Sequence, residues 1–116
     1  MPALNDKTNG AEIQQAVDTL ALPWPDVATS KMFGSRAYRA KGVLFAMIGG
    51  RGLILTKLDP RQRDAAAEAH DGRPFVGRGK VIPGWTEFRL VAASDLDPLA
   101  ALVRNAYENA LSEAAK

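Results

Sequence analysis

A stripe of apolar residues at helical spacing predicts a helix near the start of the chain. The stripe falls at i, i+3, i+4 and i+7 and consists of Ile13, Ala16, Val17 and Leu20. We expect Thr8 or Asn9 to cap this helix, because Asn9 and Glu12 have capping-box spacing. Pro23 and Pro25 end it, since proline supplies no backbone donor.

The middle of the chain changes to short apolar segments that are separated by glycine. The segments 35–40, 43–48 and 53–58 are divided by Lys41-Gly42 and by the run from Gly49 to Gly52. Glycine in such breaks permits the positive φ angles that tight hairpin turns require. Segment 43–48 is apolar throughout, as in a strand that is covered on both faces. The pattern predicts an antiparallel meander of three strands.

A second helix is predicted to follow the meander. Asp59 suits a helix cap and Pro60 suits the first helical position. The helix runs to about His70, and Gly72 is placed to end it. Because its only apolar residues are alanines, we expect it to lie on the surface of the domain.

Two further strands and a closing helix complete the pattern. Phe75 and Val76 are expected to pair within a stretch rich in glycine and proline. Alternation over 85–91 predicts a strand with Thr86, Phe88 and Leu90 on one face and Trp85, Glu87 and Arg89 on the other. Asp97-Pro98 starts the last helix. Its apolar stripe consists of Leu99, Leu102, Val103, Ala106, Ala110 and Leu111.

These elements predict an α+β domain with two layers and the order α-β-β-β-α-β-β-α. The expected sheet is antiparallel, with the helices mainly on one face. A chain of 116 residues is too short for two independent cores, so we expect one domain over 1–116 with a core from about 10 to 112.

Composition narrows the function classes. Hydrophobic residues make up 47% of the chain and charged residues 24%, which is typical of a globular domain. The absence of cysteine excludes disulfides, thiolate metal sites and cysteine nucleophiles. The longest apolar run, 43–48, is too short to cross a bilayer, and the first residues lack the pattern of a signal peptide. We therefore expect a cytoplasmic protein that does not associate with membranes.

The charge is distributed unevenly. The net charge is only +2, but residues 31–89 carry twelve basic and five acidic residues, whereas both ends of the chain are acidic. A basic middle can mark a surface that binds anions. It can equally be neutralised by the acidic ends once the chain folds.

Groups that commonly carry catalysis are sparse. His70 is the only histidine, and a histidine near a helix end usually interacts with the last carbonyls. The glycine runs at 49–52 and 77–79 lack the strand-to-helix context of a phosphate loop, so turn chemistry explains them. Asp95 and Asp97 fit helix capping. We predict no catalytic residue, no metal site and no cofactor.

Basic residues near aromatic side chains form two groups along the predicted strands. Tyr38 accompanies the first group and Trp85 the second, where each aromatic is either a stacking platform for bases or part of the core. The candidate phosphate contacts for a nucleic acid are Arg36, Arg39, Lys41, Arg78, Lys80 and Arg89.

The order of several short motifs resembles the N-terminal domain of the TfoX/Sxy family. The likeness starts at the segment Lys31, Met32, Phe33 and Gly34. It extends over roughly residues 28–112, through Tyr38, Gly42, Arg73-Pro74-Phe75 and Pro83-Gly84-Trp85. The YjbR/MmcQ-like family is the nearest alternative, because of Leu22-Pro23 and the strand at Trp85. One departure is Ser35, where family members often carry another glycine.

The resemblance implies a bacterial α+β domain like that of secretion chaperones and YjbR-like proteins, and it supplies no catalytic residues. The founding members of the family regulate natural competence and carry a second, C-terminal domain. Our first hypothesis is a non-enzymatic regulatory or interaction domain that binds a protein partner or a second copy of itself. Nucleic-acid binding through the basic strands is the alternative. A small-ligand binder or an unrecognised enzyme is the third hypothesis.

Overall fold

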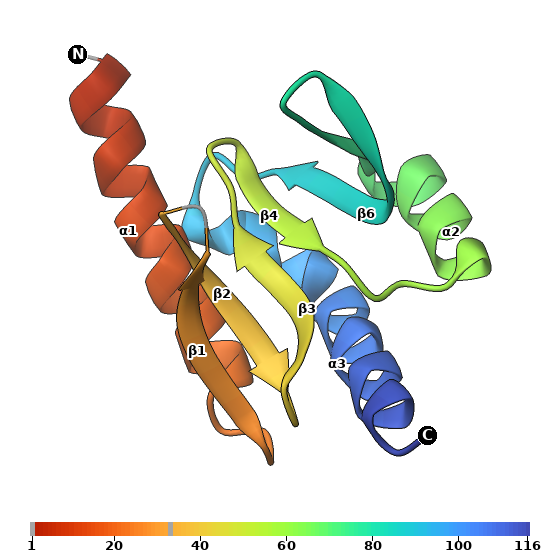
Figure 1. Ribbon diagram of the computed structural model, residues 1–116. Coiled ribbons are helices and arrows are strands. Elements are labelled where there is room, and N and C mark those ends of the chain that lie inside the picture. The colour runs from red at the N-terminus through yellow and green to blue at the C-terminus, as the bar shows by residue number, and fades with distance from the viewer. Residues whose placement is uncertain (1, 33) are drawn as a thin grey trace.

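The computed structural model of the chain describes residues 2–32 and 34–116, with side chains from Gly10 onward. The described residues form three α-helices, one 3-10 helix and a six-stranded sheet (Figure 1). In chain order the elements are α1 (Pro2–Ala21), β1 (Val27–Met32), β2 (Ser35–Ala40), β3 (Val43–Ile48), β4 (Gly52–Leu55), α2 (Pro60–His70), β5 (Arg73–Gly77), β6 (Lys80–Arg89), η1 (Ala93–Leu99) and α3 (Ala100–Ala114). The predicted α+β class is confirmed.

The sheet is antiparallel throughout, with the order β1-β2-β3-β4-β6-β5. The predicted meander corresponds to β2, β3 and β4. Strand β1 adds to the predicted elements and pairs with β2 over its whole length. Its sequence contains few large apolar residues because it lies at the edge of the sheet, so hydrophobic alternation gave no signal for it.

Two hairpins turn on residues with positive φ, as the glycine pattern predicted. Lys41 and Gly42 connect β2 to β3 with φ angles of 48° and 84°. Arg78 and Gly79 connect β5 to β6 with φ angles of 52° and 77°. Positive φ at both central residues defines the type I′ turn, whose twist matches the flanking strands. The turn interpretation of the run at 77–79 is therefore confirmed.

The helices bury their apolar residues against one face of the sheet (Figure 1). Val17 of α1 and Val103 of α3 are fully buried there. Phe45 of β3 meets Tyr107 of α3 edge to face, with ring centroids 5.7 Å apart. The Tyr107 hydroxyl donates to the Pro25 carbonyl at 2.8 Å, which fixes the chain after α1 against α3. The predicted stripes of the first and last helices thus form this core.

The opposite face of the sheet is covered by side chains of its own strands β5 and β6. Phe75 of β5 and Trp85 of β6 pack against the buried Met47 and Ile54. Strand β6 bends at Gly84, whose φ is 83°, where the register with β5 also shifts. This bend carries the β5–β6 hairpin over the meander. Strand β3 is therefore covered on both faces, as its apolar sequence predicted.

Several predicted boundaries differ from the structure. Helix α1 begins at Pro2, so neither Thr8 nor Asn9 is its cap; polar residues with capping spacing also fit an interior turn of a helix. Strand β4 spans Gly52–Leu55 instead of 53–58. Asp97 and Pro98 do not start the last helix. They lie inside η1, and α3 begins at Ala100.

Other local predictions are confirmed. The Asp59 side chain accepts the Gln62 amide at 2.7 Å, and Gln62 accepts the Asp59 amide in return. Thr86 and Phe88 of β6 and the following Leu90 are buried, as the alternation required. No helix among the described residues has the length and hydrophobicity needed to span a membrane.

Candidate functional site

Arg36, the first candidate nucleic-acid contact, is held by an acidic residue of α1. Its Nε and Nη2 donate to the two carboxylate oxygens of Asp18 at 3.2 and 3.1 Å. The Tyr38 hydroxyl donates to the same carboxylate at 2.5 Å. Burial and the Asp18 carboxylate raise the pKa of Tyr38 far above its ordinary value. Tyr38 is fully buried, so it belongs to the core and offers no face for stacking.

Arg39 and Lys41 lie close to the first hairpin turn. Arg39 lies three residues after Arg36 in β2. Because successive side chains of a strand point to opposite faces, Arg39 and Arg36 lie on opposite faces of the sheet. Its Nη1 donates to the Gly42 carbonyl at 3.4 Å. Lys41 is a central residue of the turn, and its Nζ lies 4.0 Å from Asp26. The first predicted basic group is therefore divided between two faces of the sheet.

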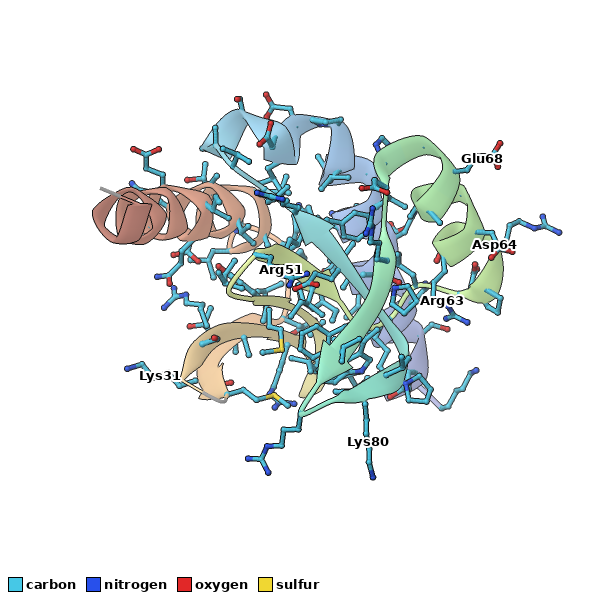
Figure 2. The ribbon with its side chains drawn as sticks, turned by 90° about the horizontal axis from the view of Figure 1, so that it is seen from above. Lys31, Arg51, Arg63, Asp64, Glu68 and Lys80 are labelled. Atoms are coloured by element: carbon cyan, nitrogen blue, oxygen red, sulfur yellow. The ribbon has the colours of Figure 1, made fainter. Side chains whose placement is uncertain are left out.

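The second predicted basic group is divided along β6. Arg78 and Lys80 are exposed at the tip of the β5–β6 hairpin, and Figure 2 shows Lys80 pointing away from the body. Arg89 is at the other end of the ten-residue strand. The structure thus does not bring Arg89 together with Arg78 and Lys80.

The residues that carry the family resemblance lie around the β1–β2 turn. Lys31 and Met32 end β1, and Met32 packs against the core on the helix-free face of the sheet. Gly34 has a φ of 77°, which suits a tight turn. Phe33 lies outside the described residues.

Arg89 instead lines a cleft with two other arginines. The cleft has a volume of about 560 Å³ and lies where the β3–β4 turn, the start of β5 and the end of β6 meet α1. Its charged lining residues are Arg51, Arg73 and Arg89 together with Asp71 and Glu87. We call this site the arginine cleft. Figure 2 shows Arg51 near the middle of the view, whereas Lys31 and Lys80 lie at the periphery.

Glycine brings the β3–β4 turn close enough to β6 to build the cleft. Gly49 and Gly52 exchange backbone hydrogen bonds of 2.8 and 3.3 Å across the turn. The Arg51 carbonyl accepts the Leu90 amide at 3.0 Å, which ties the turn to the end of β6. A Cβ on Gly52 would lie 2.5 Å from the backbone of Leu90 and of Phe88. Glycine at position 52 therefore lets the β3–β4 turn lie directly against the chain at Phe88 and Leu90.

The charges of the arginine cleft are only partly compensated. Arg73 meets Asp71 at 3.4 Å, and both side chains are more than 70% exposed. An ion pair with this exposure contributes little. Within residues 10–32 and 34–116, Arg51, Arg89 and Glu87 take part in no ion pair or side-chain hydrogen bond. Two guanidinium groups with five N–H donors each are thus open to a ligand.

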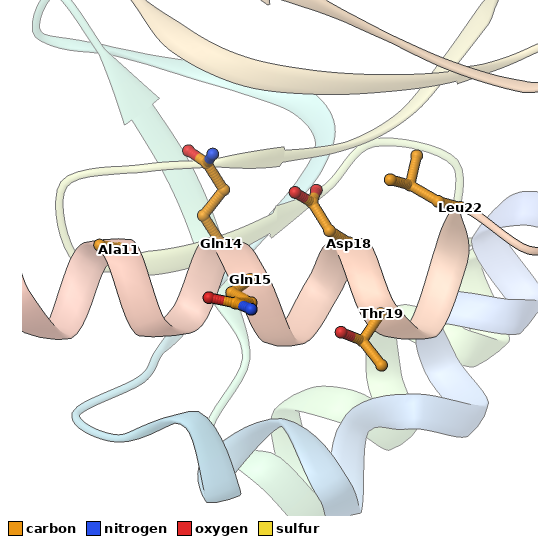
Figure 3. Close-up of a pocket in the computed structure, with 6 residues that line it drawn as sticks. All are labelled: Ala11, Gln14, Gln15, Asp18, Thr19 and Leu22. Atoms are coloured by element: carbon orange, nitrogen blue, oxygen red, sulfur yellow. The ribbon is translucent and has the colours of Figure 1, made fainter.

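In each of two other depressions, a charged side chain is already bound to other residues. A shallow one of about 440 Å³ runs along the outer side of α1, beside Gln14, Asp18 and Leu22 (Figure 3). Asp18 is already held by Arg36 and Tyr38. A crevice of about 280 Å³ lies between α2 and the β5–β6 hairpin, where the Arg63 Nη1 donates to the Leu58 carbonyl at 2.7 Å.

The remaining titratable candidates lie outside the arginine cleft. His70 is exposed in the last turn of α2. The Asp95 carboxylate accepts the amides of Val91 and Ala92 at 2.8 and 3.0 Å, which lowers its pKa. No group of three or more His, Asp or Glu side chains in the described part of the chain is arranged to hold a metal.

Comparison of the chain with protein-family models, with curated proteins and with solved structures found no match. The arrangement of the cleft residues is therefore the basis for assigning a function.

Of the three arginines in the cleft, only Arg89 is among the residues that the sequence predicts to bind an anion. Arg51 stands within a glycine run that was interpreted as a turn, and the structure confirms the turn. The position of Arg51 in a tight turn could have indicated a binding residue, because turn residues are exposed at the end of a sheet. Arg73 had no comparable signal, since its position opposite Glu87 depends on the register of β5 with β6.

Proposed function

We propose that this protein is a non-enzymatic domain that binds an anionic small molecule in the arginine cleft. The observation that carries the proposal is the convergence of Arg51, Arg73 and Arg89 from three separate segments on one cleft. Two of these arginines have no charged or hydrogen-bonding side-chain partner in the described residues. The volume of about 560 Å³ is within the range of small-ligand sites.

The chemistry of the arginines favours an oxyanion. A guanidinium group is planar and permanently charged, and it presents paired donors that match the oxygens of a phosphate or a carboxylate. Since Arg51 approaches from the β3–β4 turn, Arg73 from β5 and Arg89 from β6, the three arginines can contact different oxygens of one group. A phosphate, with its tetrahedral oxygens, suits this arrangement better than a planar carboxylate.

The proposed role is binding and regulation without chemical conversion. The described lining residues of the cleft include no histidine, lysine or hydroxyl side chain, so no imidazole, amine or hydroxyl nucleophile among them faces a ligand there. The sequence resemblance to the TfoX/Sxy N-terminal domain supports the same kind of role. The resemblance, the cytoplasmic location and a protein partner or homodimer stay predictions from the sequence.

The test is a titration of the purified protein with inorganic phosphate, in which binding is measured by isothermal calorimetry. We expect saturable binding that is abolished in the double variant Arg51→Gln/Arg89→Gln. The matched control is Arg61→Gln/Lys80→Gln, which removes the same charge at two exposed positions outside the cleft. The proposal fails if the wild type shows no saturable binding. It also fails if the control variant loses as much affinity as the cleft variant.

A further inference from the structure

Glu87 stands between two arginines of the cleft. Its Cα is paired with Arg73 on β5 on one side and with Ile54 on β4 on the other. Directly paired residues share a face of the sheet, and so do residues two apart on one strand. Arg73, Glu87 and Arg89 therefore lie on the same face, with the carboxylate in the middle.

The Glu87 carboxylate is directed toward the β3–β4 turn. Its Oε2 lies 3.9 Å from the position that a Cβ on Gly49 would take, so the carboxylate and Arg51 border the same space. Glu87 is half-buried, yet no described residue donates a side-chain hydrogen bond to it. A half-buried carboxylate that no protein donor satisfies is suited to accept hydrogen bonds from a ligand.

A simple anion would use only part of this site. Inorganic phosphate would gain contacts with the arginines, but it carries the same sign of charge as Glu87. A ligand with hydroxyl groups next to its phosphate would donate to the carboxylate while the arginines hold the phosphate. Ile48 and Val91 line the same cleft and supply apolar surface for a carbon skeleton.

We propose that the ligand of the arginine cleft is a phosphate monoester of a polyhydroxy compound, such as a sugar phosphate, recognised by Arg51, Arg73 and Arg89 at the phosphate and by Glu87 at the hydroxyls. This inference rests on the proposed function and specifies its ligand class. A nucleic-acid strand fits less well, because Glu87 and Asp71 would repel the further phosphates of a polyanion.

The experiment compares ribose 5-phosphate with methyl phosphate, which carries the same phosphate monoester without hydroxyl groups. We expect the wild type to bind ribose 5-phosphate about 10-fold more tightly, the usual effect of one or two hydrogen bonds to a charged group. In Glu87→Ala, the ratio of the two affinities should fall to about 1 by the same argument. The affinity for methyl phosphate should stay equal or rise in this variant, because a nearby negative charge is removed.

The outcomes separate this inference from the proposed function. Equal binding of the two probes by the wild type overturns the ligand class and leaves anion binding in place. Binding of neither probe overturns both. Tighter binding of a short single-stranded oligonucleotide, lost in Arg51→Gln/Arg89→Gln, assigns the cleft to nucleic acid and overturns the sugar-phosphate class. If Glu87→Ala fails to fold, the near-isosteric Glu87→Gln provides the same comparison with a smaller expected change.

Discussion

Arg36 and the arginines of the cleft come from the same basic region of the sequence and have different environments in the fold. Arg36 faces α1, and its guanidinium is bound on two nitrogens by Asp18. Arg51 and Arg89 lie in an open cleft, without an ion-pair partner in the described residues. An arginine is therefore structural or available to a ligand depending on which acidic side chain the fold brings to it.

The surroundings of the two sites differ in burial as well. Asp18 serves both Arg36 and the fully buried Tyr38, so three polar side chains satisfy one another. In the cleft, Arg73 and Asp71 meet only at 3.4 Å and in solvent. We therefore expect substitutions in the first site to change stability and substitutions in the second to change ligand binding.

The largest expected effect is that of Gly52→Ala. The added Cβ would lie 2.5 Å from the Phe88 carbonyl oxygen and from the Leu90 amide nitrogen, and the φ of 149° is itself strained for alanine. We expect a loss of about 3 kcal/mol or more, measured by urea denaturation. Gly50→Ala is the matched control within the same turn, because its Cβ would meet nothing within 4 Å. A similar loss in both variants would contradict the role of Gly52 in bringing the turn to β6.

Next in size is Asp18→Ala, which removes the shared acceptor of the structural site. The buried Tyr38 hydroxyl and the Arg36 guanidinium both lose their partner, and we expect a loss of about 2 kcal/mol. Urea denaturation measures the effect, with the exposed Asp64→Ala as control. Phosphate binding should be unchanged in Asp18→Ala. An unaltered midpoint would show that Asp18 does not contribute to stability.

Arg36→Ala and Arg89→Ala should differ in which property they change, stability or ligand binding. We expect Arg36→Ala to cost about 1 kcal/mol, because the half-buried Asp18 loses its ion pair. Arg89→Ala should change stability by less than about 0.5 kcal/mol, since its side chain is exposed. In urea denaturation Arg36→Ala should lose more stability than Arg89→Ala, whereas in phosphate titration Arg89→Ala should lose more affinity than Arg36→Ala. The same ranking in both measurements would contradict the distinction.

The smallest expected effect is a pH dependence of stability due to Tyr38. Burial raises the pKa of Tyr38 above the ordinary value of about 10, so the folded state holds the hydroxyl proton more tightly than the unfolded state. The stability from this group is therefore fully present below about pH 10 and declines as the pH rises further. Tyr38→Phe should be less stable than the wild type by about 1 kcal/mol at pH 7.

The difference in stability between wild type and Tyr38→Phe should stay constant up to about pH 10, the ordinary tyrosine pKa, and shrink as the pH rises further. Urea denaturation at several pH values measures it. A difference that stays constant or grows above about pH 10 would argue against a buried, protonated Tyr38.

Local chemistry was predicted well from the sequence. The stripes of the first and last helices, the cap at Asp59 and the inner face of β6 are all confirmed. These features depend on residues within one or two turns of each other, so the pattern contains the necessary information. Strand β1 was not predicted, because an exposed edge strand has no apolar alternation.

The candidate site was predicted only in part. Arg89 is among the candidates because it is a basic residue close to Trp85 on a predicted strand. Its neighbours in the cleft are not, since Arg51 joins it through the backbone contact with Leu90 and Arg73 through the pairing of β5 with β6. Neither contact leaves a signature in a single sequence.

The sequence by itself therefore determined the α+β class, the helical stripes, the turns and the basic character of the middle region. The tertiary structure alone decided which cations are neutralised and which remain open. Asp18 and Arg36 are 18 residues apart, and Arg51 and Arg89 lie on different hairpins. The physical reason is that propensity and periodicity act within an element, whereas electrostatic partnership depends on strand register and on the packing of α1, which no local pattern specifies.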